Sequence, residues 1–190
     1  MTGYFGKVST HGDFVSRRLP AGLVAAWDGW LQQCIRASRA RLGDRWLQHY
    51  LTSPVWRFAV SPGVLGPAGL GGVMMPSVDR VGRYFPLMIG ATGAPPLQEW
   101  VKRHGAWFDA LDELARESLA PGFTLERFDA ASEPVFGPAT GPDGAALHGH
   151  SLWWREGEPG VDASPLVCQG MPAPQDFAAM LDCSWARPRA

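Results

Sequence analysis

The 190-residue sequence has few cysteines, no long apolar run and no excess of charge of either sign. Its three cysteines, Cys34, Cys168 and Cys183, are odd in number and far apart, which argues against a disulfide framework and against a CxxC zinc or redox site. No segment approaches the roughly 18 apolar residues that span a bilayer, and the first residues lack a basic stretch followed by an apolar run. We therefore expect a cytoplasmic protein without membrane insertion.

The charges nearly balance, with 17 Lys and Arg against 18 Asp and Glu. No basic block follows any expected helix, so binding to nucleic acid or to an anionic membrane has little support. Hydrophobic residues make up 46% of the chain, as in a globular protein, and the length suffices for one domain with its own core. We expect a single domain, 1–190, with a flexible Gly/Pro-rich loop at about 130–149.

Two segments, 20–42 and 97–119, show the three- and four-residue spacing of apolar residues that is typical of amphipathic helices. In the second helix, Asp112 and Arg116 are expected as an ion pair on the solvated face. The glycine-rich stretch 66–72 lacks the Lys-Ser/Thr of a phosphate-binding loop and is interpreted as a flexible connector. Runs of β-branched and aromatic residues predict strands at 3–8, 55–60, 73–78 and 84–89, and order around 151–154.

A first group of polar side chains lies within residues 11–18. There, His11, Asp13, Arg17 and Arg18 place an imidazole, a carboxylate and two guanidinium groups within eight residues. Such a group can bind an anion or another protein. The alternative is structural, with Asp13 capping a short helical turn and the arginines solvated.

A second polar group lies in the turn 76–86, between two apolar strands. Its charged residues, Asp79, Arg80 and Arg83, are costly to bury unpaired. Arginine offers a planar fork that suits a carboxylate or a phosphate. The alternative is an internal ion pair between Asp79 and Arg83 that fixes a hairpin. Because both interpretations predict that Arg83→Ala is harmful, that substitution does not separate them.

Catalysis has weaker support in the sequence. Ser77, His11 and Asp79 could in principle form a Ser, His and Asp set, but no G-x-S-x-G elbow accompanies them. A small hydrolase or transferase that uses His11 and Asp79 is therefore an alternative, not the main expectation. His148 and His150 lie in a Gly-rich loop without a carboxylate or thiolate at ligand spacing, so zinc is not expected. We expect no catalytic residue, metal or cofactor.

Several stretches together resemble the TagF (ImpM) family, whose members are encoded with type VI secretion systems. The resemblance is dense over residues 3–90 and looser afterwards. The matching stretches are GYFGKV at 3–8, HGDFVSRRLP at 11–20, WD and WL within 27–31, LTSPVWRF at 51–58 and GVMMPSVDRVGRYFPL at 72–87, with SLWW at 151–154 and GMP at 170–172.

This resemblance implies a cytoplasmic regulator that acts after translation through protein–protein interaction, generally to restrain the assembly or firing of the secretion apparatus. It also implies a three-layer α/β/α sandwich with a mixed, largely antiparallel central sheet. Some relatives carry a fused Ser/Thr phosphatase domain, for which this sequence is too short. A link to phosphorylation signalling is therefore expected through partners, among them a forkhead-associated scaffold protein of the same system.

The resemblance transfers no catalytic residues, so the site prediction rests on the two polar segments. We expect the loop 11–18 and the turn 79–83 to meet at one edge of the sheet and to form a docking surface for a secretion component. A permanent structural adaptor of the apparatus is the other alternative, and a large apolar exposed patch would favour it.

Overall fold

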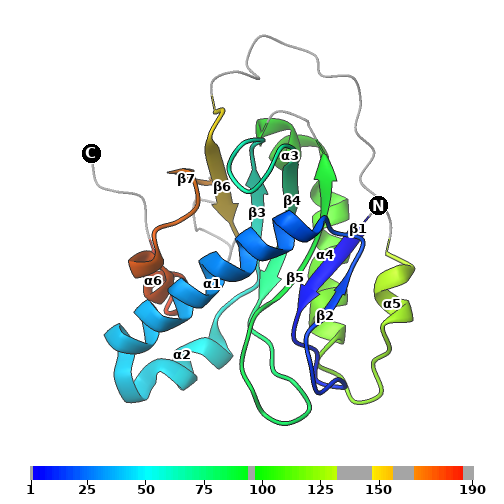
Figure 1. Ribbon diagram of the computed structural model, residues 1–190, viewed down its shortest axis with the longest axis vertical. Coiled ribbons are helices and arrows are strands. Elements are labelled where there is room, and N and C mark those ends of the chain that lie inside the picture. The colour runs from blue at the N-terminus through cyan, green and yellow to red at the C-terminus, as the bar shows by residue number, and fades with distance from the viewer. Residues whose placement is uncertain (1, 94–96, 132–146, 156–164, 186–190) are drawn as a thin grey trace.

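The computed structural model describes residues 2–93, 97–131, 147–155 and 165–185, which form an open sheet with helices packed against it (Figure 1). Seven strands pair in the order β2-β1-β5-β4-β3-β6-β7, and every described pairing is antiparallel. The strands are β1 (Thr2–Gly6), β2 (Val15–Arg17), β3 (Trp56–Val60), β4 (Gly69–Met75), β5 (Leu87–Gly93), β6 (His150–Trp154) and β7 (Leu166–Gln169). The expected α/β fold with a largely antiparallel sheet is confirmed, and the parallel component of a mixed sheet is not found among these strands.

Helices pack on both faces of this sheet (Figure 1), and each face has its own hydrophobic cluster. Helices α1 (Ala21–Leu42), α2 (Trp46–Thr52) and α6 (Phe177–Leu181) contribute to one cluster. Helices α3 (Leu97–Arg103), α4 (Gly105–Glu117) and α5 (Glu126–Asp129) contribute to the other. The short 3-10 helices η1 (Gly43–Arg45) and η3 (Pro174–Asp176) adjoin the first set.

Helix α1 has nearly the bounds and the buried face that its apolar spacing predicts. The Trp27 ring is fully buried, with its centroid 4.8 Å from that of Phe58 on β3 and 6.2 Å from that of Trp153 on β6. Rings of this size remove large apolar areas from water and so dominate the packing of helix on sheet. The helix ends at Gly43, whose φ of 53° is accessible to glycine at low cost and whose N–H donates to the Arg39 carbonyl.

The predicted helix over 97–119 is in fact two helices, α3 and α4. The break lies at His104, whose φ of −119° and ψ of 22° depart from helical values, and the weak helix former Gly105 follows it. The His104 carbonyl still accepts the N–H of Phe108 at 3.0 Å, which starts α4. The apolar spacing is the same on both sides of the break, so periodicity alone does not reveal it.

Asp112 on α4 also differs from the prediction, because it is buried instead of forming a solvated pair with Arg116. Its Oδ2 accepts hydrogen bonds from Nε and Nη2 of Arg57 on β3, at 3.0 and 2.6 Å. Arg57 Nη2 also donates to Asp109 at 2.8 Å. A buried guanidinium is tolerated only with such partners, so this ion pair ties α4 to the centre of the sheet.

The glycine-rich stretch is largely strand and not a connector, since residues 69–72 form the first half of β4. A Cβ on Gly71 would lie 2.4 Å from the Trp100 ring of α3. A Cβ on Gly72 would lie 2.2 Å from the Ile89 carbonyl oxygen of β5. These glycines are therefore required by close approach of a tryptophan and of a neighbouring strand.

Other boundaries follow from prolines or depart from the expected ranges. Pro76 directly follows β4 and Pro86 directly precedes β5, so both prolines lie at strand ends, where a missing backbone donor removes no ladder hydrogen bond. The strand expected over 84–89 therefore begins only at Leu87. The short elements β2, α5 and β7 were not anticipated. Residues 132–146, most of the expected loop at 130–149, lie outside the described residues.

Candidate functional site

The two polar segments singled out in the sequence contact each other at the lower end of the sheet in Figure 1. The Arg80 backbone N–H donates to the His11 carbonyl at 2.9 Å. The Arg83 guanidinium donates through Nη2 to the Gly12 carbonyl. We refer to residues 9–13 and 79–83 together as the hairpin–turn surface.

Asp79 lies beneath this contact and fixes the shape of the turn. Its side chain is fully buried, and Oδ2 accepts hydrogen bonds from Lys7 Nζ at 2.9 Å and from Arg83 Nε at 2.7 Å. Oδ1 accepts the backbone N–H groups of Val81 and Arg83, at 3.0 and 2.9 Å. Burial acts to raise the pKa of Asp79, but these hydrogen bonds outweigh it and hold the pKa well below its usual range. The carboxylate is thus a charged structural centre.

Lys7 is the buried counterpart of Asp79, with only 3% of its surface exposed. Its Nζ also lies 4.2 Å from the centroid of the Phe14 ring, within the range of a cation–π contact. Phe14 stacks on Phe5 of β1 with ring centroids 5.5 Å apart, yet 45% of Phe14 stays exposed. The ring therefore covers the ion pair on one side and faces solvent on the other.

Ser77 and His11 have partners of their own. The Ser77 hydroxyl donates to the Lys7 carbonyl at 2.8 Å, and the Tyr50 hydroxyl donates to the Ser77 carbonyl at 2.9 Å. The pKa of Tyr50 is raised, mainly because its hydroxyl group is buried. His11 Nδ1 lies 3.0 Å from Thr10 Oγ1. These contacts leave the serine and the histidine bound to different groups and not to each other.

Arg17 and Arg18 take part in a separate contact. Both guanidinium groups pair with the carboxylate of Asp129 at the end of α5. Arg18 Nη1 also approaches the Thr2 carbonyl at 3.5 Å, and its backbone adopts a left-handed φ of 60°. The two arginines therefore fasten α5 to the β1–β2 edge of the sheet.

Asp13 is exposed, and its Oδ1 accepts the N–H of Phe14 at 2.9 Å. The interpretation of Asp13 as a helix cap is wrong, because the chain enters strand β2 at Val15 instead of a helical turn. The candidate residues thus separate into two groups in the structure. His11, Asp79, Arg80 and Arg83 meet at the hairpin–turn surface, whereas Arg17 and Arg18 face α5.

Two charged partners, Lys7 and Asp129, were missed by sequence reasoning. A lysine inside the apolar strand 3–8 was an available signal, because a charge that enters the core requires an opposite charge. No neighbouring residue indicates that Asp129 forms ion pairs, because its arginine partners lie 112 and 111 residues away in the sequence.

The described residues contain no cluster of three or more His, Cys, Asp or Glu side chains placed to hold a metal ion. They also contain no helix that is both long and apolar enough to cross a membrane. Cys34 is a free, fully buried thiol on α1, and burial raises its pKa to about 12, so it packs as a small core residue.

Comparison with known proteins identifies the family of the chain. A domain family described as the TagF N-terminal domain, type VI secretion system-associated, matches residues 3–134, which include the whole hairpin–turn surface. The crystal structure of PA0076 from Pseudomonas aeruginosa PAO1 matches with a TM-score of 0.88 and 34% sequence identity, over 100% of this chain and 98% of that chain. A search among curated proteins gives no match. The chain therefore belongs to the TagF family of type VI secretion system-associated proteins.

Proposed function

We propose that the chain is a cytoplasmic protein that regulates the assembly or activity of a type VI secretion system after translation, by binding another protein of that system. Family membership supports the association with secretion. The observation that carries the binding mode is the network around the buried Asp79, in which Lys7 and Arg83 hold two segments about 70 residues apart in one surface. A surface held in this way loses little conformational entropy when a partner binds.

The hairpin–turn surface offers a partner both charge and apolar area. Arg80 is exposed, and its side chain makes neither a hydrogen bond nor an ion pair with the part of the chain that the structure describes. Val81 beside it is 65% exposed, and the Arg83 side chain is 59% exposed. Guanidinium groups next to an exposed aliphatic side chain suit a protein surface that carries carboxylates or phosphates.

A forkhead-associated scaffold protein of the same secretion system is our proposed partner. The TagF resemblance supports this choice, and the arginines of the surface are compatible with a partner that presents anionic groups. We further propose that the helices on both faces make the domain a three-layer α/β/α sandwich. The two separate hydrophobic clusters support that description.

We propose no catalytic activity for the chain. Asp79 is held by Lys7 and Arg83, and the Ser77 hydroxyl donates to a backbone carbonyl, so the hydrolase alternative gains no support from this geometry. Such a mechanism needs a nucleophile within hydrogen-bond reach of its base.

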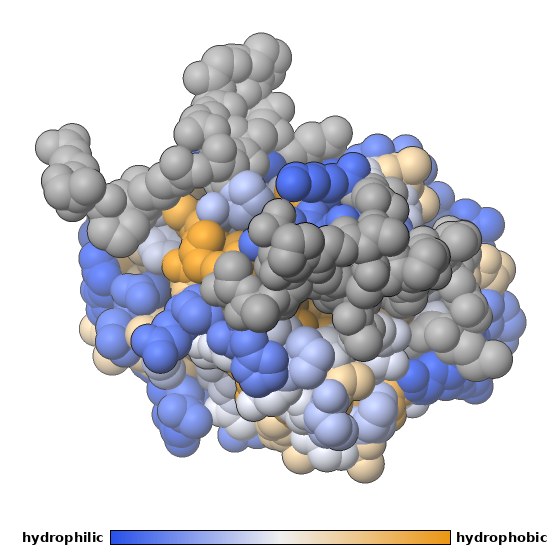
Figure 2. Space-filling view, turned by 90° about the horizontal axis from the view of Figure 1, so that it is seen from above, coloured by the Kyte–Doolittle hydropathy of each residue, from blue (hydrophilic) through white to orange (hydrophobic). Residues whose placement is uncertain are grey.

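The alternative of a permanent adaptor also gains little support. Among the large exposed hydrophobic side chains of the described residues, Leu47 and Leu51 lie together on α2, and the others lie elsewhere along the chain: Phe14, Val81, Leu119 and Val167. Among the coloured residues of the face shown in Figure 2, hydrophilic and intermediate residues are mixed with smaller hydrophobic groups. A permanent assembly partner buries a larger and more apolar patch than this.

Affinity capture from the native bacterium tests the proposal. The tagged wild-type chain is expected to retain type VI secretion components, among them the forkhead-associated protein, and Arg80→Glu is expected to retain at least about tenfold less. Arg80 is the sharpest position because, among the described residues, its side chain has no hydrogen-bond or ion-pair partner to lose. The control is Lys102→Glu on α3, an exposed cationic residue at the upper end of the sheet in Figure 1, opposite the hairpin–turn surface.

A secretion assay completes the test. In a strain that lacks the native gene, the wild-type and Lys102→Glu copies are expected to restore the normal amount of secreted substrate, and the Arg80→Glu copy is not. The proposal fails if wild-type capture recovers no secretion component, or if Arg80→Glu behaves as the control does in both assays. Circular dichroism and the unfolding midpoint establish first that both variants are folded.

A further inference from the structure

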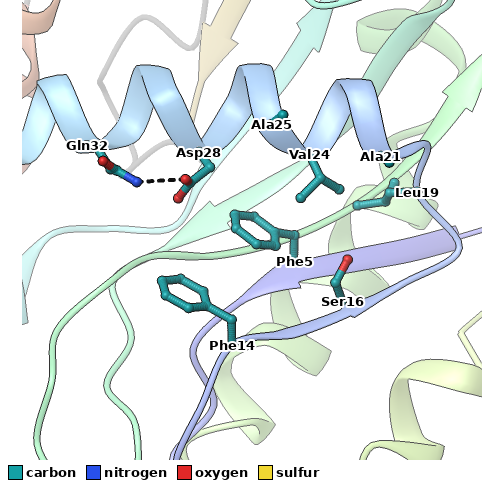
Figure 3. A pocket seen from close by; sticks show the side chains of 9 residues that line it. All are labelled: Phe5, Phe14, Ser16, Leu19, Ala21, Val24, Ala25, Asp28 and Gln32. Carbon is teal, nitrogen blue, oxygen red and sulfur yellow. Dashed lines mark hydrogen bonds between the residues drawn. The ribbon is translucent and has the colours of Figure 1, made fainter.

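A second concave surface lies between the edge strand β2 and the first half of α1 (Figure 3). It encloses about 480 Å³, within the range of roughly 300–1,000 Å³ that is common for ligand clefts. We call it the β2–α1 groove. It is lined by Phe5, Phe14, Ser16, Leu19, Ala21, Val24, Ala25, Asp28 and Gln32.

Apolar side chains make up most of this groove. Figure 3 shows the Phe5 and Phe14 rings on the sheet side, with Val24 and Leu19 pointing toward them from the α1 side. Phe14 is 45% exposed, and Val24 is half-buried. An open apolar groove of this kind favours a ligand that brings apolar side chains of its own.

Strand β2 supplies a backbone edge beside the groove. It is the terminal strand of the seven-stranded order, so its outer edge has no partner strand among the described residues. An edge strand presents unpaired N–H and C=O groups that can pair with another extended chain. Ser16 lines the groove, whereas Arg17 pairs with Asp129 near the opposite face. A strand added to β2 would therefore direct every second side chain into the groove.

The charge of the groove further restricts the kind of ligand that can bind there. Asp28 is the single charged residue among its lining residues. Asp28 Oδ2 accepts a hydrogen bond from Gln32 Nε2 at 2.7 Å, and over the described residues Oδ1 has no hydrogen-bond donor. The guanidinium groups of Arg17 and Arg18 are paired with Asp129 and do not line the groove. The groove therefore has an acceptor for a cation beside its apolar wall.

We propose that the β2–α1 groove binds an extended segment of a partner protein, which adds an antiparallel or parallel strand to β2. The segment places apolar side chains between Phe5 and Val24 and a Lys or Arg side chain against Asp28. Addition of a strand at a sheet edge is a recurrent mode of peptide recognition, in which the backbone gives affinity and side-chain pockets give specificity. The inference rests on the proposed function only in taking the ligand to be a protein, and it uses a different surface.

A library of random heptapeptides displayed on phage is the first probe. Selection against the whole wild-type chain is expected to enrich sequences with apolar residues at alternate positions and one Lys or Arg at a fixed spacing from them. A synthetic copy of the most enriched peptide then gives a dissociation constant by fluorescence anisotropy. N-methylation of its alternate backbone amides is expected to weaken binding at least about tenfold, because those amides would pair with β2.

Two neighbouring positions on α1 provide a matched pair of variants. Ala25 lines the groove and Ala26 does not, and both are exposed on the same helix. Ala25→Arg is expected to weaken the peptide at least about tenfold by filling the groove and repelling a cation, and Ala26→Arg is expected to leave the dissociation constant unchanged. Asp28→Lys is expected to weaken binding of the selected peptide about fivefold. The same variant is expected to bind a second peptide, in which the Lys or Arg is replaced by Glu, more tightly than the wild type does.

Three outcomes would overturn the inference. The first is selection that enriches no peptide family, and the second is equal binding to Ala25→Arg and Ala26→Arg. The third is reversible dimerisation in sedimentation equilibrium that Ala25→Arg abolishes, which would make a second copy of the chain the occupant. Because these measurements need no secretion component, they can fail while capture through Arg80 succeeds, and the reverse also holds.

Discussion

The hairpin–turn surface and the β2–α1 groove adjoin at Phe14, yet they use their polar groups in opposite ways. In the first, the Asp79 carboxylate accepts four hydrogen bonds and the turn is fixed from within. In the second, the sheet edge and one oxygen of Asp28 have no partner among the described residues. The difference separates a region whose charges specify conformation from a region whose unused groups can recognise a ligand.

The ion pair of Lys7 and Asp79 also shows how buried charges affect the stability of the fold. Removing Lys7 and Asp79 from water carries a desolvation cost that offsets much of their attraction, so the net stabilisation by the pair is smaller than the attraction alone. Breaking the pair by removing one partner costs much more, because the other charge stays buried. The four predictions that follow test this contrast, beginning with the largest effect.

Lys7→Met is expected to lower the free energy of unfolding by roughly 3 kcal/mol, because a buried carboxylate loses its buried cation. Urea unfolding followed by tryptophan fluorescence measures the change. Lys102→Met on α3, an exposed position, is the control and is expected to change stability by less than about 0.5 kcal/mol. If the two lysine variants are equally stable, the pair does not hold the turn.

The dependence of stability on pH is expected to report on Asp79. Its pKa is lowered on folding, so its contribution is complete above the unfolded value of about 3.9 and is lost as the pH falls below it. Stability of the wild type is therefore expected to decrease more steeply between about pH 5 and pH 2.5 than that of Asp79→Asn. Urea midpoints across this range measure both slopes, and parallel profiles would contradict the prediction.

Arg83→Met is expected to cost less than Lys7→Met, at about 0.5–1 kcal/mol, although both residues pair with the same carboxylate. The Arg83 side chain is 59% exposed, so solvent screens its charge, whereas that of Lys7 is 4% exposed. Added salt is expected to shrink the Arg83 effect and to leave the Lys7 effect nearly unchanged. A larger loss for Arg83→Met than for Lys7→Met would show that the exposed contacts fix the turn.

Ala25→Arg and Ala26→Arg are expected to change the free energy of unfolding by less than about 0.5 kcal/mol each, because both positions are exposed on α1 and arginine is a good helix former. Thermal unfolding followed by circular dichroism compares them. A marked loss confined to Ala25→Arg would mean that the groove is packed interior and not an open surface.

Local patterns in the sequence predicted several of the helices and strands. The apolar spacing over 20–42 predicted α1 and its buried face, and the β-branched and aromatic runs predicted strands that overlap β1, β3, β4 and β5. Each of these features depends on residues close in sequence, where backbone geometry and periodicity act directly.

Features that depend on distant residues were predicted poorly. Gly71 was interpreted as part of a connector, because nothing in its neighbourhood indicates that the Trp100 ring lies against it. Asp112 was placed on the solvated face, because its partner Arg57 lies 55 residues away. Strand β2 has only three residues, too few for alternation to be recognised.

The candidate site was predicted in part. The sequence singled out both segments of the hairpin–turn surface, because charged residues between apolar strands need a partner or a function. The sequence did not show that Arg17 and Arg18 belong to a different contact from Arg83. That contact depends on Asp129, which lies close to the two arginines only in the folded chain. The sequence also showed no sign of the groove, whose walls come from β1, β2 and α1 together.

The sequence by itself determined the family, the main helix of the core and the location of its polar segments, because these are properties of composition, spacing and motif. Tertiary structure alone decided which charge meets which, that Asp79 is enclosed by Lys7 and Arg83, and that an edge strand faces α1 across an open groove. The physical reason is that burial and electrostatic pairing depend on distances in space, and residues 70 or more positions apart acquire those distances only when the sheet assembles.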